Sequence, residues 1–121
     1  MPVLIIYGVP ENMSGKLEEL TSDLINTVAY SVTELKLKTS DVSCFYPKDM
    51  MSKGLGEEII IFVDCLTEKP ERTEEVRNRL AQSIVETALR YFRDANLIEC
   101  FIRPFNPIQG FSAVRLDQTS K

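Results

Sequence analysis

Short apolar runs alternate with longer amphipathic segments along the chain. Four runs are short and rich in β-branched or aromatic residues, which is typical of strands that are largely buried. They are residues 3–7, 41–46, 58–63 and 97–102. Residues 111–114 are a candidate for one more short edge strand.

Two longer segments carry apolar residues at intervals of three and four, the spacing of a helix with one buried face. The first extends from an expected N-cap at Ser14 to Leu35. The second follows Pro70 and Thr73, and Glu74 and Glu75 lie in its first turn, where negative charge is favourable.

The resulting order, β-α-β followed by β-α-β, predicts one domain over residues 1–121 with similar halves at about 1–47 and 57–115. The predicted fold class is α/β (α+β): a four-stranded mixed sheet with two helices on one face. A ferredoxin-like arrangement has the same order of elements and is the alternative.

The strands at 3–7 and 58–63 are apolar at nearly every position, as strands are when both faces of the sheet are buried. Two helices can cover only one face, and the remaining sequence is not helical enough to cover the other. We therefore expect identical subunits to pack sheet against sheet.

The composition of the chain argues against some classes of binding partner. A net charge of -4 argues against nucleic-acid binding and against a polybasic membrane-surface protein. No apolar run approaches the roughly 20 residues that span a bilayer, so we expect a cytoplasmic protein.

The three cysteines lie in apolar runs, and we expect all of them to be reduced core residues. The chain has no histidine, which excludes histidine bases and argues against a zinc site. Pro2 offers a different base. If Met1 is removed, the Pro2 nitrogen becomes a secondary amine; if Met1 is kept, that nitrogen is an amide and cannot take up a proton.

The chain from Pro2 to about Phe111 resembles the tautomerase superfamily, in particular members like macrophage migration inhibitory factor and the carboxymethyl-hydroxymuconate isomerases. The resemblance rests on element order, length and a few anchors along the sequence. They are Met1-Pro2 before an apolar strand, Val9-Pro10, Pro47, Gly54 and Gly56, and Gly110-Phe111.

This resemblance implies a homotrimer and a cofactor-free reaction in which Pro2 moves a proton within a small keto or enol acid. It places the family's substrate-binding lysine at Lys36, with Lys38 as a substitute. The polar pocket positions of the family fall on Glu99 and Phe101, which depart from its pattern. Arg103 is expected on the same strand face, either to bind carboxylate or to pair with Glu99 at a subunit contact.

Two functions follow. The first is a keto-enol tautomerase or isomerase with Pro2 as base. The alternative is a non-catalytic binding or assembly protein on the same scaffold, which the residues at Glu99 and Phe101 favour because an acidic group repels an anionic substrate.

Overall fold

A computed structural model of the chain describes residues 1–116. The strands are β1 (Val3–Tyr7), β2 (Ser43–Phe45), β3 (Glu58–Thr67) and β4 (Leu97–Phe105), and the helices are α1 (Leu17–Tyr30) and α2 (Glu74–Leu89). Short 3-10 helices lie at Glu11–Lys16, Thr33–Leu35 and Thr39–Asp41. The last five residues of the predicted domain, 117–121, lie outside the described part of the chain.

The four strands form one mixed sheet in the order β2-β1-β3-β4. β1 is parallel to β2, β3 is parallel to β4, and the two central strands β1 and β3 are antiparallel. The strands of each β-α-β half are therefore direct neighbours. In the ferredoxin-like arrangement another strand separates them, so that alternative is wrong.

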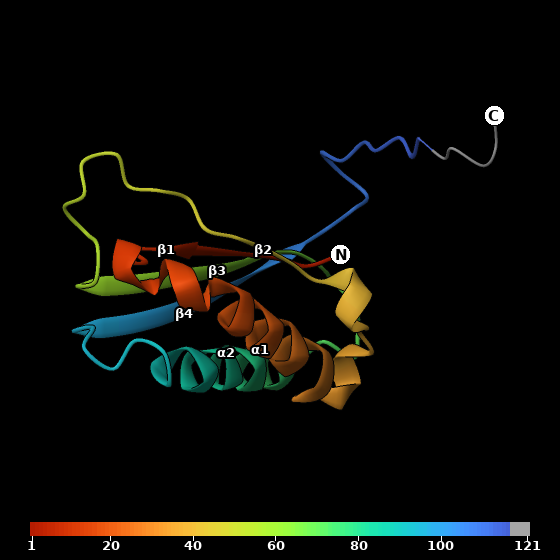
Figure 1. Cartoon of the computed structure of the whole chain (residues 1–121). Coiled ribbons are helices and arrows are strands. Elements are labelled where there is room, and N and C mark those ends of the chain that lie inside the picture. The colour runs from red at the N-terminus through yellow and green to blue at the C-terminus, as the bar shows by residue number, and fades with distance from the viewer. Residues whose placement is uncertain (117–121) are drawn as a thin grey trace.

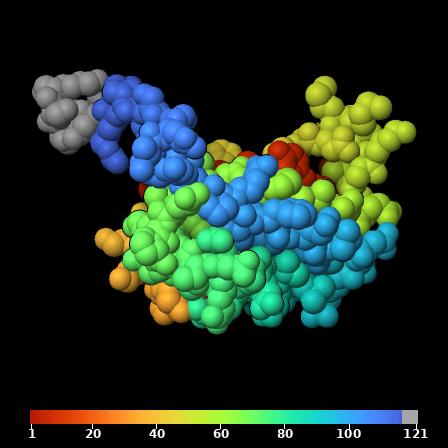
Figure 2. Space-filling model, turned by 180° about the vertical axis from the view of Figure 1, so that it is seen from behind, coloured from red at the N-terminus to blue at the C-terminus, as the bar shows by residue number. Residues whose placement is uncertain are grey.

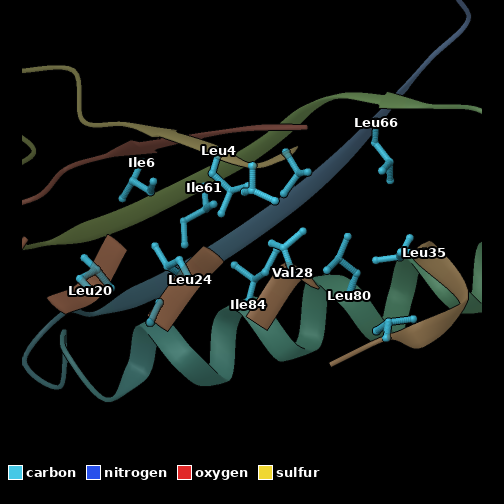
Figure 3. Close-up of a cluster of buried hydrophobic side chains, with 14 of the residues drawn as sticks. Leu4, Ile6, Leu20, Leu24, Val28, Leu35, Ile61, Leu66, Leu80 and Ile84 are labelled. Carbon is cyan, nitrogen blue, oxygen red and sulfur yellow. The ribbon is translucent and has the colours of Figure 1, made fainter. Parts of the chain in front are cut away.

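Both helices cover the same face of the sheet, as predicted (Figure 1). Alternate strand residues point at them and are completely buried, among them Leu4, Ile6 and Ile61. Figure 3 shows these three side chains facing helix residues such as Leu24 and Ile84. This single layer of side chains is the hydrophobic core.

The opposite face of the sheet is open and apolar. One row across it, in register, consists of Phe45, Ile5, Phe62 and Phe101. Phe45 is 57% exposed and Phe101 is 45% exposed. The loop between β2 and β3 and the segment after β4 both project on this side, so the face forms the floor of a saddle (Figures 1 and 2).

The first helix is shorter than predicted. It ends at Tyr30, and the apolar residues Val32 and Leu35 reach the core from the irregular segment that follows. The predicted N-cap of this helix is also wrong, because Ser14 lies within the preceding 3-10 helix. The start of α2 is as predicted: the Thr73 hydroxyl accepts a hydrogen bond from the Val76 amide at 3.2 Å.

Near the C-terminus, β4 continues through Pro104 to Phe105 instead of ending at Ile102. β4 is an edge strand, so the missing N–H of Pro104 leaves no ladder partner unpaired. Residues 111–114 are not a strand, which corrects the prediction. Within residues 1–116, neither helix has the length and apolar content needed to cross a membrane.

Candidate functional site

Pro2 immediately precedes β1 and is buried. Its carbonyl oxygen accepts a hydrogen bond from the Ser43 amide at 3.2 Å, which joins the start of β1 to the start of β2. Met1 is 69% exposed, so the bond that must be cut to free the Pro2 nitrogen lies next to an accessible residue. A buried site of this kind disfavours the charged form of an amine.

Lys36 and Lys38 lie on the segment that leads from α1 to β2, at the same end of the sheet as Pro2 (Figure 1). Both side chains are exposed. Lys36 has a left-handed backbone, with φ of 54°, just after the buried Leu35. The Lys38 amide donates to the Asp41 carboxylate at 2.9 Å, and this bond shapes the turn that enters β2.

Arg103 is on the open face of β4 and is bound to Asp64 of β3. Its Nε and Nη2 atoms lie 2.5 and 2.6 Å from the two carboxylate oxygens, and its guanidinium carbon lies 4.1 Å from the centre of the Phe62 ring. The carboxylate raises the pKa of Arg103 further above its usual value. Within one subunit Arg103 therefore pairs with Asp64, and its pairing with Glu99 at a subunit contact stays a prediction.

Glu99 instead faces another acid. A side-chain hydrogen bond with Glu58, followed by burial, raises the pKa of Glu99. Phe101 stacks on Phe62 with ring centroids 5.4 Å apart. The three β4 candidates thus share the open face of the sheet, as the sequence predicted, with Phe101 exposed between two polar neighbours.

A single chain does not bring Glu99 and Phe101 to Pro2. Glu99 is level with Ile60 and Tyr7, at the far end of β1. Five residues of strand and two strand spacings separate it from Pro2, about 17 Å along the sheet and about 10 Å across. Within one subunit, Pro2 shares its end of the sheet with Lys36 and Lys38, and with Arg103 on the open face, since the Asp64 that binds Arg103 pairs with Val3.

The glycine-containing loop between β2 and β3 is also at the far end. The Asp49 carboxylate organises it by accepting hydrogen bonds from the amides of Met51, Lys53 and Gly54, and these bonds lower the pKa of Asp49. A hollow of about 380 Å³ lies between this loop and Tyr7. The loop can approach a Pro2 site only from another copy of the chain.

The sequence did not reveal an irregularity beside Pro2. β3 shifts register between Val63 and Leu66, and Cys65 at this bulge has φ of 64°. Cys65 is exposed, which corrects the prediction that all three cysteines are core residues. Burial raises the pKa of the other two thiols, to about 11 for Cys44 and about 12 for Cys100. The bulge lies opposite the start of β1, because Val3 pairs with Asp64.

Arg72 was missed as well. It is only 7% exposed, and its guanidinium donates to the carbonyl oxygens of Thr67 at 2.7 Å and Leu35 at 3.0 Å. It therefore ties the end of β3 to the turn that carries Lys36. Nothing in the pattern of apolar residues distinguishes Arg72 from the surface charges around it.

Comparison with known proteins identifies the fold. No protein-family model matches the sequence, and no curated protein matches it. Solved structures do match. A fused 4-OT symmetric trimer is 12% identical over 97% of this chain and 96% of that chain, with a TM-score of 0.66. Macrophage migration inhibitory factor from Toxoplasma gondii is 16% identical over 93% of this chain and 97% of that chain, with a TM-score of 0.65.

A third match is Pt0534 inactivated by 2-oxo-3-pentynoate, which is 13% identical over 84% of this chain and 85% of that chain, with a TM-score of 0.57. The four-stranded mixed sheet and two helices of this chain thus have the fold of these solved tautomerase-like structures, which is the fold that the resemblance in sequence predicted.

Proposed function

We propose that this chain, which has the tautomerase fold, is a cofactor-independent keto-enol tautomerase or isomerase of a small carboxylic acid, with Pro2 as its base. The observation that carries the proposal is the placement of Pro2. It is buried at the start of β1, at the end of the sheet where Lys36 and Lys38 project. A free amine there would have a neutral, basic nitrogen close to two cations that attract an anionic substrate.

The reaction needs one group that moves a proton and one that holds charge. The neutral Pro2 nitrogen accepts the proton of the enol hydroxyl, and the enolate electrons form the carbonyl. The protonated amine then gives its proton to the carbon atom. Lys36 or Lys38 holds the substrate carboxylate and offsets the negative charge of the enolate in the transition state.

We further propose that the working form is a homotrimer. The open face of each sheet is the surface that would be covered, and its apolar row across all four strands supports this. The fused 4-OT that this chain resembles is a symmetric trimer. Assembly would let Glu99, Phe101 and Arg103 of one copy approach Pro2 of another, with Phe101 as an apolar wall. Because Asp64 already neutralises Arg103, the lysines are the better carboxylate binders.

The test uses two forms of the same protein, separated by mass: one that retains Met1 and one that has lost it. They differ in whether the Pro2 nitrogen is an amide or an amine. We expect only the processed form to tautomerise phenylpyruvate, and Pro2→Ala to lower that rate strongly. Equal rates in the two forms would show that the amine of Pro2 is not the base.

A covalent probe gives a second readout. The inactivator 2-oxo-3-pentynoate carries an electron-poor alkyne, to which a neutral amine adds. We expect one equivalent to attach to the processed protein, and peptide mass spectrometry to place it on Pro2. The exposed thiol of Cys65 is a competing nucleophile, so the experiment is repeated in Cys65→Ser. Labelling that disappears in Cys65→Ser would count against a reactive amine.

A second candidate is a non-catalytic assembly protein on the same scaffold. Two observations favour it: Arg103 is occupied by Asp64, and Glu99 adds negative charge to the open face. In that case the processed protein would form oligomers, would not turn over enol acids and would not be labelled at Pro2.

A further inference from the structure

A second hollow lies where β3 ends and α2 begins, and it is strongly basic. Its volume is about 510 Å³. The residues that line it are Glu68, Lys69, Pro70, Arg72, Arg77 and Pro104. Three basic side chains and one acidic side chain give this lining a net charge of +2, although the chain as a whole has a net charge of -4.

Arg72 is the unusual member of the lining. The residue is 7% exposed, and its two terminal nitrogens donate to the carbonyl oxygens of Thr67 and Leu35. Its Nε atom is buried and has no hydrogen-bond partner among residues 1–116. No carboxylate of these residues lies within 4.0 Å of the guanidinium.

A buried cation that contacts only neutral carbonyls leaves its charge uncompensated, which is costly in a protein interior. Burial accordingly lowers the pKa of Arg72, and the nearby charge of Glu71 opposes this only in part. Protein interiors normally supply such a cation with an anion, and Arg72 is one of the residues that line the hollow.

The surrounding turn is held in place. The Arg72 amide donates to the Lys69 carbonyl at 2.9 Å, which closes the turn that connects β3 to α2. Arg77, in the second turn of α2, donates through Nη1 to the Arg72 carbonyl at 2.7 Å. This bond fixes the Arg77 side chain against the turn, and Arg77 lines the same hollow as Arg72. In the described part of the chain neither Lys69 nor Arg77 forms an ion pair.

From these observations we propose that the hollow binds a phosphate group, held by Lys69, Arg72 and Arg77. Phosphate fits for two reasons. Its negative charge at neutral pH matches the +2 lining and offsets the buried charge of Arg72, and its several oxygens can accept from the free donors of Arg77 and Lys69 together. This site is independent of Pro2 and does not require removal of Met1.

The test is a titration of the full chain with inorganic phosphate, followed by ¹H–¹⁵N NMR at constant ionic strength set with chloride. We expect saturable shifts in the amides of residues 67–77. Arg77→Gln is the test variant, because Arg77 is partly exposed and its loss leaves the buried Arg72 in place. It should weaken binding by about tenfold or more, the effect of losing a charged hydrogen bond.

Arg93→Gln is the matched control. It removes the same charge from an exposed position beyond the far end of α2, about 20 Å away, and should leave phosphate binding unchanged. Two results would overturn the proposal: no saturable shift beyond that of chloride, or an equal loss of affinity in Arg77→Gln and Arg93→Gln. A phosphate monoester such as glycerol phosphate forms a second arm. If it binds more tightly than inorganic phosphate, the ligand is an esterified phosphate; if less tightly, it is the free ion.

Discussion

Phe101 gives the sharpest test of how the open face of the sheet is used. This side chain is 45% exposed, lies at the β4 end of the apolar row and stacks on its neighbour in that row, Phe62. A phenylalanine side chain buries about 200 Å² when fully covered, so about 90 Å² remains to be covered in an assembly. At about 25 cal/mol per Å², covering that area stabilises the assembly by about 2 kcal/mol per subunit.

In a closed trimer the three copies together contribute about 6 kcal/mol, which is about 10⁴-fold in the association constant. Since that constant depends on the square of the concentration, Phe101→Ser should raise the midpoint of assembly about 100-fold. Analytical ultracentrifugation over a wide concentration range measures this shift.

Tyr30→Ser is the matched control for this experiment. Tyr30 is 67% exposed, but it is at the end of α1, on the helical side of the molecule. Its loss should leave the midpoint unchanged, and circular dichroism should show that both variants are folded. The reasoning would be refuted if the native protein stayed monomeric throughout, or if the two variants had the same midpoint.

Three further predictions concern stability, and chemical denaturation measures each. Thr73→Ala should lower the free energy of unfolding by about 1 kcal/mol because α2 loses its N-cap, whereas Thr73→Ser should retain most of it. Gly8→Ala should lower the free energy of unfolding by more than about 1 kcal/mol, because φ is +87° and the new Cβ would lie 2.1 Å from the Glu58 carbonyl oxygen. In Gly15→Ala the new Cβ meets nothing within 4 Å, so the loss of stability should be far smaller. The raised pKa of Glu99 contributes stability that is complete below the ordinary pKa of 4.5 and is lost as the pH rises through the raised value; Glu99→Gln should abolish this decline, and an unchanged pH profile would contradict it.

The sequence predicted those parts of the fold that depend on local patterns. The apolar run at 3–7 became β1, and Thr73 caps α2 as its position suggested. The extent of the first helix was wrong because Val32 and Leu35 keep the helical spacing although the backbone has already left the helix. A buried face can be continued by a turn, so spacing alone does not locate the end of a helix.

The candidate site depended on contacts between distant segments, and those were harder to predict. Residue alternation placed Glu99 and Arg103 correctly on one face of β4. Their partners, Glu58 and Asp64, come from β3, and the choice follows from the register of the two strands. That register includes a bulge at Cys65, which no residue pattern indicates.

The antiparallel pairing of β1 with β3 relates the two halves of the chain by an approximate twofold axis. The halves are alike in architecture, yet Pro2 precedes β1 whereas Glu57 precedes the corresponding strand β3. The corresponding strand β3 starts at Glu58, where the backbone nitrogen belongs to a peptide bond. Duplication of the fold has therefore not duplicated the residue on which the proposed chemistry depends.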